Sequence, residues 1–509
     1  MSEYQALVLT VYFGTVGILS LYGLHRYLIL YLYYHNRRAC PVPKGRFAEL
    51  PAVTVQLPLY NELYVVDGLL DAVAALDYPR DRLEIQVLDD STDETVELVA
   101  GKVAALRQSG LDIVHVRRPN RKGYKAGALA HGLPAAKGAL IAIFDADFRP
   151  SPDLLMRTVH FFTDPQVGMV QTRWGHLNED FSLLTQLQGM MIDGHLILEQ
   201  TARNRTGRFC SFNGTAGIWR RACIEDAGGW QCDTLTEDLD LSYRAQLRGW
   251  RFVFLPEIVT PAELPVDMAA FKSQQHRWAK GSVQTAMKML PPVLRARLPF
   301  PVKLEAVVHL SANLAYLLLI VLCFLMFPSL SAVRQPSTVQ MFLIDLPIFV
   351  AASVSVGMFY FCGQLERGRS FRQVFWRVPL LLGLGVGMSI NNGRAVAEAL
   401  FGLRSGFTRT PKFGARSPER ALRRVSAYRR YLTFGDRTCL VELLFGLYYS
   451  WLVGHALSNG NWVALPFLLI FQFGFLYVGL SSLTALARPQ DGGAGGGVGA
   501  GELGAATAA

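Results

Sequence analysis

The sequence predicts an α/β fold in which a nucleotide-binding domain with a mostly parallel sheet is inserted between transmembrane α-helices. Two observations lead to this fold class. The chain has 509 residues, of which 51% are hydrophobic and only 18% charged, and several apolar runs are long enough to cross a bilayer. Between the first of these runs and the others, short strand-like segments alternate with helical or turn-rich segments, as in parallel sheets.

The charged residues and the cysteines exclude two other classes of protein. The formal net charge is +10, but Arg and Lys cluster beside apolar runs. Membrane topology explains this charge, and no nucleic-acid partner is expected. The seven cysteines have neither a metal-binding spacing nor a paired framework, so we expect ordinary buried cysteines in a reducing compartment.

Residues 1–38 are expected to form an N-terminal transmembrane helix. Ala6–Leu24 contains no charge, and Arg37 and Arg38 follow the apolar run. A cleaved signal peptide would carry its basic residues before the apolar core, which is not the pattern here. The arginines place the following domain on the cytoplasmic side and the N-terminus outside.

Residues 39–265 are predicted to hold the sheet domain. Buried parallel strands are expected at Val53–Pro58, Leu83–Leu88, Asp112–Val116 and Ala139–Phe144. Polar residues follow the first, second and fourth of them, and such sheets bind ligands beyond the carboxyl ends of their strands. The side chains expected to converge there are Tyr60, Glu62, Asp89, Asp90, Asp145 and Asp147.

Asp145 and Asp147 predict a metal site. Two carboxylates one residue apart repel each other unless a cation neutralises them, and oxygen-only ligands select Mg²⁺ or Mn²⁺. An ion with so few protein ligands completes its shell with phosphate oxygens, which indicates a nucleotide diphosphate. Lys125, in the basic and glycine-punctuated segment 117–127, is expected to contact the same phosphates, although this segment could also be a solvated loop.

Helical patterns are expected in the rest of this domain. Residues 161–199 have helical spacing, and residues 209–219 are a glycine-rich turn region that allows a ligand to approach closely. Thr236 is a good N-cap for the helix that follows, and residues 90–93 could cap a helix from Glu94 onward.

Residues 266–300 are predicted to be interfacial helices that connect a polar site to the bilayer surface. Gln274 offers an amide, Arg277 a planar fork of donors for phosphate oxygens, and Trp278 a flat face for a pyranose ring. The same residues also fit a basic amphipathic helix resting on anionic lipid, so alone they decide little.

The C-terminal half is predicted to be the membrane half. Residues 301–362 are expected to hold two transmembrane helices and residues 438–487 a hairpin, which gives five spans in total. Residues 363–437 are expected to be a cytoplasmic interfacial or gating segment, within which Val378–Leu400 is interfacial or re-entrant because a very basic stretch follows it. The Gly/Ala-rich tail, residues 488–509, is expected to be disordered.

Several motifs occur in a fixed order within a match that runs from about Pro58 to Gly414. They are Pro-Leu-Tyr-Asn-Glu, Asp-Asp-Ser-Thr-Asp, Gly-Tyr-Lys-Ala-Gly-Ala-Leu, Phe-Asp-Ala-Asp-Phe, Asn-Gly-Thr-Ala-Gly, Thr-Glu-Asp-Leu-Asp-Leu and Gln-Gln-His-Arg-Trp. With them the chain resembles membrane-embedded polysaccharide synthases of glycosyltransferase family 2, especially plant cellulose-synthase-like A and C proteins and their bacterial relatives. The resemblance implies a GT-A type domain that transfers a hexose, with inversion, to the 4-hydroxyl of a growing β-glycan.

The resemblance also implies roles for the candidate site residues. Asp238 would be the general base. The donor would be bound by Tyr60, Glu62, Asp89, Asp90, Lys125, Asp145, Gln274 and Arg277, the acceptor by Asn213, Glu237 and Trp278, and the metal by Asp145 and Asp147. Residues 407–412 lie where cellulose synthases carry a mobile gating loop, although the letters differ.

The expected function is that of a processive polysaccharide synthase in a bacterial inner membrane or a Golgi-like membrane, surrounded by membrane lipid. Its donor would be UDP-glucose or GDP-mannose, and its product a β-1,4-linked glucan or mannan passed across the membrane. A non-processive lipid glycosyltransferase, similar to ceramide glucosyltransferases, is the alternative because it shares the Asp motifs and an Arg-Trp pair. A scaffold built on an inactive enzyme fold is not favoured, because no acidic motif is broken.

Overall fold

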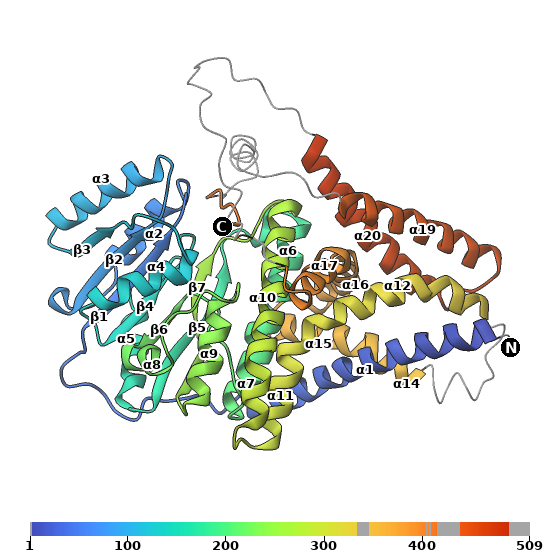
Figure 1. Cartoon of the computed structure of the whole chain (residues 1–509), viewed down its shortest axis with the longest axis horizontal. Coiled ribbons are helices and arrows are strands. Elements are labelled where there is room, and N and C mark those ends of the chain that lie inside the picture. The colour runs from blue at the N-terminus through green and yellow to red at the C-terminus, as the bar shows by residue number, and fades with distance from the viewer. Residues whose placement is uncertain (1–2, 333–345, 404–405, 407–408, 415–437, 488–509) are drawn as a thin grey trace, which may run out of the picture.

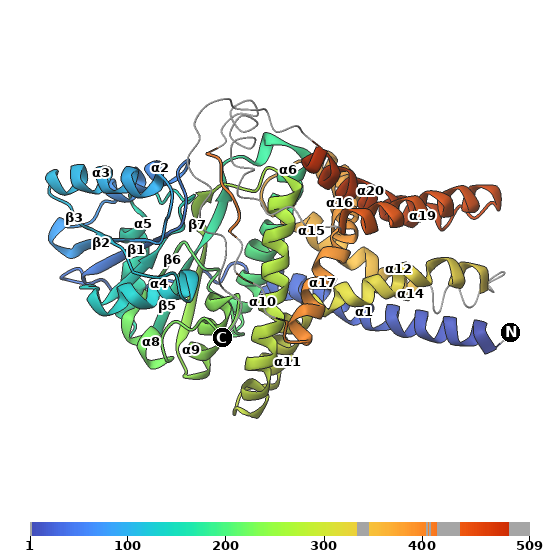
Figure 2. The same cartoon turned by 45° about the horizontal axis from the view of Figure 1, so that its top comes forward.

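The computed structural model describes residues 3–332, 346–403, 406, 409–414 and 438–487. A sheet domain and a bundle of apolar helices lie at opposite ends of the molecule, with the long helix α10 (Met268–Arg295) between them (Figure 1 and Figure 2). The Gly/Ala-rich tail and most of the basic stretch 404–437 lie outside the described residues.

The sheet has seven strands in the order β3-β2-β1-β4-β6-β5-β7, and only the pairs made by β6 are antiparallel. The strands are β1 (Val53–Leu59), β2 (Leu83–Asp89), β3 (Asp112–Val116), β4 (Leu140–Ile143), β5 (Val167–His176), β6 (Gly217–Arg220) and β7 (Arg251–Ala262). The predicted mostly parallel α/β domain is confirmed, and its first four strands lie where the sequence places them.

Helices cover both faces of the sheet, which is why its central strands are apolar along their length. They are α2 (Val66–Ala74), α3 (Thr95–Gln108), α4 (Tyr124–Gly132), α5 (Leu154–Thr158), α8 (Arg221–Asp226) and α9 (Glu237–Leu247). Two further helices of this domain, α6 (Leu183–Asp193) and α7 (Thr201–Arg205), pack on α10 and on the N-terminal helix. One buried cluster joins α2, α3 and α5 to β1 and β2, and a second joins α4, α8 and α9 to β4 on the other face.

Residues 167–176 form strand β5, so the helical pattern predicted for residues 161–199 is wrong over this part. The strand lies inside the sheet, antiparallel to β6 and parallel to β7. Gln171 and Thr172 are buried in it because their side chains donate to the backbone carbonyl of Ala216 at 3.0 and 2.7 Å. These satisfied polar residues hide the apolar pattern of a buried strand. A π-helical segment, Gly194–Gln200, continues α6 further along.

The two predicted helix caps differ in outcome. The carboxylate of Asp93 accepts from the backbone N–H of Thr95 at 3.0 Å, at the start of α3. The hydroxyl of Thr236 makes no such bond to α9 and lies 3.1 Å from the hydroxyl of Thr285 in α10. Thr236 thus occupies the predicted N-cap position of α9, but its side chain does not form the cap bond.

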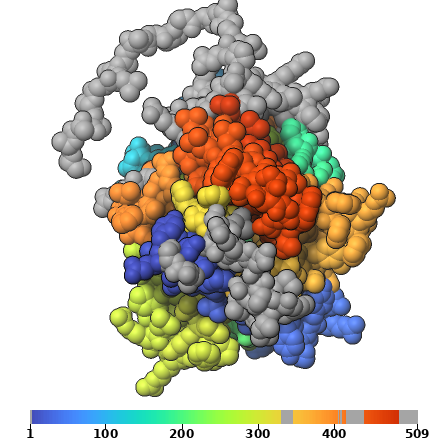
Figure 3. Space-filling view, turned by 90° about the vertical axis from the view of Figure 1, so that its right-hand side faces the viewer, coloured from blue at the N-terminus to red at the C-terminus, as the bar shows by residue number. Residues whose placement is uncertain are grey.

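Five helical segments among the described residues are long and apolar enough to cross a membrane, and they match the five predicted spans. They are Glu3–Asn36, Phe300–Ser329, Leu346–Glu366, Thr438–Ser458 and Leu465–Leu483. The helices concerned are α1 (Glu3–Asn36), α11 (Phe300–Ser311), α12 (Ala315–Ala332), α14 (Leu346–Phe349), α15 (Ser355–Glu366), α19 (Thr438–Ser458) and α20 (Leu465–Ala487). Seen from the bundle end, α1 in blue, α12 in yellow and α19 with α20 in red lie together (Figure 3). The chain is an integral membrane protein.

Helices α16 (Phe371–Gly387) and α17 (Ser389–Leu400) meet at a bend of 43° and are long enough to span only as a pair. Such a bend is compatible with a broken span or a re-entrant segment, so the predicted re-entrant character of Val378–Leu400 stays a prediction. All seven cysteines are free, and four of them are buried.

Candidate active site

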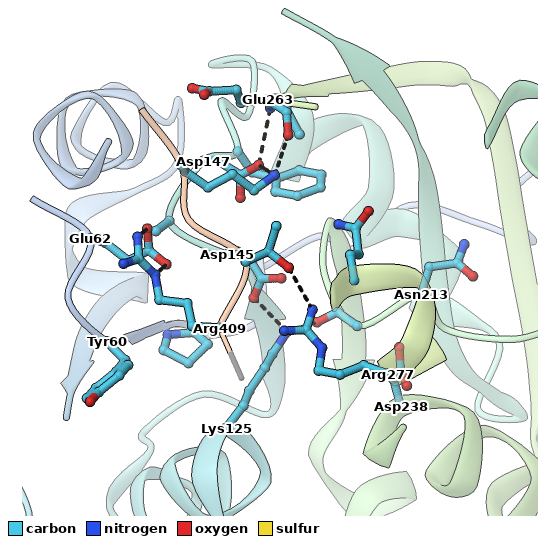
Figure 4. Close-up of a pocket in the computed structure, with 18 of the residues that line it drawn as sticks. Tyr60, Glu62, Lys125, Asp145, Asp147, Asn213, Asp238, Glu263, Arg277 and Arg409 are labelled. Carbon is cyan, nitrogen blue, oxygen red and sulfur yellow. Dashed lines mark hydrogen bonds and ion pairs between the residues drawn. The ribbon is translucent and has the colours of Figure 1, made fainter. Parts of the chain in front are cut away.

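The carboxyl ends of β1 and β4 open into a cavity of about 220 Å³ (Figure 4). Every predicted site residue except Asp89 lines it. These residues are Tyr60, Glu62, Asp90, Lys125, Asp145, Asp147, Asn213, Glu237, Asp238, Gln274, Arg277 and Trp278. The fold thus assembles motifs that are far apart in the sequence into one site.

Lys125 and Asp145 form an ion pair in this cavity. The Nζ atom of Lys125 lies 2.6 Å from Oδ1 of Asp145 and donates to the carbonyl oxygen of Gly214 at 2.8 Å. Gly214 has φ +83°, and a Cβ there would lie 2.9 Å from Oδ2 of Asp238, so this turn requires glycine. Burial lowers the pKa of Lys125, but Asp145 and the other nearby carboxylates outweigh it and the pKa is raised. Burial likewise raises the pKa of Asp145, against the pull of Lys125.

Asp147 and Glu62 are neutralised by two basic residues that were not predicted as site residues. Asp147 accepts from Nζ of Lys412 at 2.7 Å and from the backbone N–H of Glu263 at 3.1 Å. Arg409 donates from Nε and Nη2 to the two carboxylate oxygens of Glu62 at 2.8 and 2.5 Å. Burial raises the pKa of Glu62 to about 7, although Arg409 acts against this rise.

Arg409 and Lys412 belong to the segment 407–412, where a gating loop was expected. Residues 407 and 408 lie outside the described residues, but Arg409, Thr410 and Lys412 line the cavity. The hydroxyl of Thr410 accepts from Nη2 of Arg277 at 3.1 Å. This segment therefore contacts both the acidic residues at the strand ends and helix α10.

Asp89 and Asp90 point to opposite sides at the end of β2, because successive strand residues alternate. Asp90 lines the cavity and accepts from Nε and Nη2 of Arg118 at 2.7 and 2.5 Å. Asp89 is buried, accepts from the backbone N–H of Ser91 at 2.8 Å and lies 2.9 Å from Nε2 of His115. Asp89 stabilises the loop that follows β2 through these contacts. It does not line the cavity, so it is not placed for the direct donor contact that was predicted for it.

Tyr60 forms a flat platform together with Arg121, another residue that was not predicted. The guanidinium carbon of Arg121 lies 3.3 Å from the centroid of the Tyr60 ring. Both residues line the cavity, as Asp90 does. A planar cation on an aromatic ring suits the stacking of a nucleobase.

Asp238 and Glu237 open α9 at the edge of the cavity. Burial and the neighbouring Glu237 raise the pKa of Asp238 to about 7, against the pull of Lys125. A carboxyl group with this pKa can exchange a proton near neutral pH. Asp240 is different, because it is buried and paired with Arg244 at 2.8 Å and Lys288 at 2.9 Å. Asp238 is therefore the carboxylate suited to act as a base.

Helix α10 brings Gln274, Arg277 and Trp278 to the cavity. It packs closely on the loop before α9, since a Cβ at Gly281 would lie 2.6 Å from Cγ2 of Thr236. Burial lowers the pKa of Arg277 to about 10, while the carboxylates of the cavity raise it. Arg277 thus stays charged at neutral pH and reaches toward Asp145 (Figure 4).

A second cavity of about 1390 Å³ adjoins the first and lies between the apolar helices. Tyr12 of α1, Leu319 of α12, Leu382 of α16 and Phe471 of α20 are among its wall residues. Some residues line both cavities, and we call this set the neck. The neck consists of Trp174, Ile192, Asn213, Thr236, Asp238, Gln274 and Trp278.

The carboxylates of Asp145 and Asp147 fit a hard divalent cation. Both line the cavity, and each already attracts an ammonium group, that of Lys125 or Lys412. Within the described part of the chain, no three His, Cys, Asp or Glu side chains gather into a complete metal site. Phosphate and water oxygens would therefore supply most of the ligands.

Comparison with known proteins agrees with this geometry. Residues 51–281 match the family described as glycosyltransferase-like family 2. The chain is 44% identical over 253 residues to glucomannan 4-beta-mannosyltransferase 2 of Arabidopsis thaliana, which covers 49% of this chain and 47% of that protein. It is 42% identical over 258 residues to glucomannan 4-beta-mannosyltransferase 1 of Oryza sativa subsp. japonica, which covers 50% of each. The chain spans about half the length of the curated relatives it matches.

A solved structure shares the fold. The mannosyltransferase PcManGT of Pyrobaculum calidifontis, in complex with GDP-Man and Mn²⁺, has a TM-score of 0.51 and 23% identity, with 79% of this chain and 100% of that chain covered. This solved structure shows a shared fold, and the family match adds a similarity of sequence over residues 51–281. Residues 51–281 are therefore similar to glycosyltransferase-like family 2, and the chain shares a GT-A-like fold.

Proposed function

We propose that this chain is a processive, inverting β-1,4-hexosyltransferase that extends a glycan and passes it into the cavity between the apolar helices. The neck carries this proposal, because Asp238 and Trp278 line the catalytic cavity and the membrane cavity at once. A glycan end held there can be extended by one unit and move into the second cavity without leaving the enzyme. An enzyme that transfers one sugar to a soluble acceptor has no need of this continuous path.

In the transfer step, Asp238 takes the proton from the acceptor 4-hydroxyl while that oxygen attacks the anomeric carbon of the donor. The bond between this carbon and the diphosphate oxygen breaks, and the electron pair leaves with the diphosphate. Attack from the opposite side inverts the anomeric configuration. The pKa of Asp238, about 7, makes the carboxylate available at neutral pH.

Positive charge for the leaving diphosphate comes from Arg277 and Lys125, which lie beside Asp145. Asp145 and Asp147 would hold Mg²⁺ or Mn²⁺, which neutralises phosphate charge when it is bound. Gln274 lines the same part of the cavity and offers an amide for hydrogen bonding. Trp278 presents a face for the terminal acceptor sugar, and Asn213 and Glu237 supply polar contacts.

GDP-mannose is the donor favoured over UDP-glucose, since the relatives reported above are named as mannosyltransferases. The platform of Tyr60 and Arg121 stacks on either base and does not choose between them. We place the catalytic domain in the cytoplasm, because Arg37 and Arg38 follow α1 directly.

A non-processive lipid glycosyltransferase is the second candidate function. One part of the membrane cavity away from the neck is lined by apolar side chains, including Leu322, Phe349, Leu468 and Phe471, while Arg26, Glu199 and Arg203 line another part. The apolar walls suit an acyl chain as well as a sliding glycan. In this case the neck would hold the headgroup of a lipid acceptor.

Product analysis tests the proposal directly. Membranes containing the full chain are incubated with labelled GDP-mannose or UDP-glucose, and the product is digested with β-1,4-mannanase or β-1,4-glucanase. We expect a long glycan, present at early times with enzyme scarce, that only the enzyme matching the donor digests. A product made solely of lipid bearing one hexose would overturn the proposal and establish the second candidate.

A further inference from the structure

Trp174 lies at the neck and has no role in the account so far. It lies near the carboxyl end of strand β5, lines both cavities, and packs edge-on against Phe148 with ring centroids 5.4 Å apart. Its ring centroid lies 6.5 Å from that of Trp278, and the two planes are inclined by 51°. Two rings at this angle cannot both stack on one pyranose. The two indole rings instead present two flat faces, offset by about the length of one sugar unit, to consecutive sugar units of a glycan.

Two buried donors at the neck lack acceptors among the described residues. They are the indole Nε1–H of Trp174 and the amide Nδ2 of Asn213. The amide oxygen of Asn213 is occupied, because Nε2 of His195 lies 3.3 Å from it and Nε2 of Gln200 donates to it at 3.4 Å. The amide nitrogen has no partner among the residues that the structure describes.

A buried donor without an acceptor is costly, and a native structure that keeps one usually meets it with a ligand or water. Here two such donors accompany two aromatic faces at the passage between the cavities. Flat apolar faces combined with hydrogen-bond donors are the chemistry that recognises a sugar ring with its hydroxyl groups. Asp238 lies in the same set of residues, so a sugar bound at the neck is in reach of the base.

We infer that Trp174 is an acceptor-binding residue that holds the second sugar of the glycan while Trp278 holds the terminal one. This inference rests on the proposed function and adds to it a length requirement. A monosaccharide fills only the facet of Trp278, whereas a disaccharide also fills the facet of Trp174 and satisfies its indole N–H. Two linked sugars are then the shortest efficient acceptor.

The test uses the purified full chain with saturating labelled GDP-mannose and three acceptors, namely mannose, β-1,4-mannobiose and β-1,4-mannotriose. The wild type is expected to show a kcat/KM for mannobiose about tenfold above that for mannose, the scale of a good aromatic contact, and little further gain for mannotriose. Trp174→Ala is expected to lower the value for mannobiose about tenfold and to leave the value for mannose within about twofold. If the wild type uses UDP-glucose, the corresponding β-1,4-gluco-oligosaccharides replace these acceptors.

Two further variants separate acceptor binding from folding. Trp174→Phe keeps an aromatic face and the packing on Phe148 but removes the N–H, so its mannobiose value should fall between those of the wild type and Trp174→Ala. Trp250→Ala removes a tryptophan whose Nε1 donates to Asp226 at 2.8 Å, away from both cavities, and should change nothing. Hydrolysis of the donor by water, measured without acceptor, reports an intact donor site in each variant. If Trp174→Ala loses this hydrolysis, its donor site is damaged, and the mannobiose kcat/KM of Trp174→Phe then tests the inference instead.

The outcomes distinguish this inference from the proposed function. A wild type that uses mannose as well as mannobiose, or a Trp174 variant with intact donor hydrolysis that keeps the full preference for mannobiose, would overturn the role of Trp174 alone. A wild type that hydrolyses the donor but transfers to no saccharide of any length would overturn the proposed function, and this inference with it.

Discussion

The two ends of the catalytic cavity differ in how their polar groups are satisfied. At the strand ends, each of the carboxylates Glu62, Asp145 and Asp147 is paired with Arg409, Lys125 or Lys412. At the neck, two buried donors have no acceptor among the residues that the structure describes, and two indole rings face the passage.

This difference shows which ligand each end is built for. Charged groups that already neutralise each other can exchange partners with a charged ligand, such as a diphosphate with its cation, at little cost in net charge. Unpaired donors beside aromatic faces instead suit a neutral ligand that brings hydroxyl oxygens. Asp238, the proposed base, lies at the neck, where the catalytic cavity meets the membrane cavity. The comparison thus separates residues that act on the donor from residues that act on the acceptor, and the variants below test it.

The largest effect is expected from Asp238→Asn, which removes the base but keeps the shape of the side chain. Transfer should fall at least about a hundredfold, while donor binding stays near the wild-type value. Rates of labelled-sugar transfer and nucleotide titration check the two halves of this statement. Asp226→Asn, a carboxylate outside both cavities, is the matched control. Near-normal transfer by Asp238→Asn would show that another group is the base.

Removal of the divalent cation should affect the donor end alone. With excess EDTA we expect transfer to fall at least about tenfold, because the leaving diphosphate loses charge neutralisation, and Mg²⁺ or Mn²⁺ should restore it. Asp147→Ala should weaken this restoration, as measured by the concentration of metal that gives half the maximal rate. Full turnover in EDTA, or an unchanged metal dependence in Asp147→Ala, would contradict the assignment.

The pH dependence of transfer reports on Asp238. Its folded pKa of about 7 is raised above that of an ordinary aspartate, so the group is protonated and inactive as a base below this pH. Between pH 6 and pH 8 the rate should rise about tenfold as the carboxylate forms. The residual transfer rate of Asp238→Asn should not rise between pH 6 and pH 8. A rate that is flat over this range in the wild type would exclude Asp238 as the titrating base.

The smallest effect is expected from Arg121→Ala at the nucleobase platform. Loss of the cation over Tyr60 should raise the KM for the donor roughly twofold to fivefold and leave kcat unchanged, since it removes binding shared by the ground and transition states. Steady-state kinetics with varied donor measure both constants. Arg157→Gln, on the surface at α5, is the control. A fall in kcat with unchanged KM would place Arg121 at the reacting centre instead.

Much of this arrangement could be predicted from local sequence. Runs such as Val53–Pro58 are apolar, short and followed by polar residues, so the edge where Asp145 and Asp147 lie follows from strand direction alone. Strand β5 was missed because Gln171 and Thr172 are polar and find hydrogen-bond partners far along the chain, among them the backbone carbonyl of Ala216 just before β6. A tertiary hydrogen bond of this kind leaves no local pattern.

Other features of the site also could not be predicted from the sequence, for physical reasons. Asp89 and Asp90 are adjacent residues of the same type, so the sequence alone does not distinguish them. Because side chains alternate along β2, Asp90 points into the cavity and Asp89 points toward His115. Arg409 and Lys412 reach the site from a segment more than a hundred residues beyond α10, and no nearby residue marks that contact. The site position of Trp174 could not be predicted for the same reason, because the residue it contacts, Trp278, lies on the distant helix α10.

The central claim is that the catalytic cavity delivers its product into the membrane cavity, and a protection experiment tests it most directly. The purified chain is placed in sealed liposomes, labelled donor is added outside, and the product is then exposed to external β-1,4-glycanase with and without detergent. The account predicts a long glycan that resists the glycanase until detergent opens the liposomes. A glycan digested fully while the liposomes are sealed would contradict it.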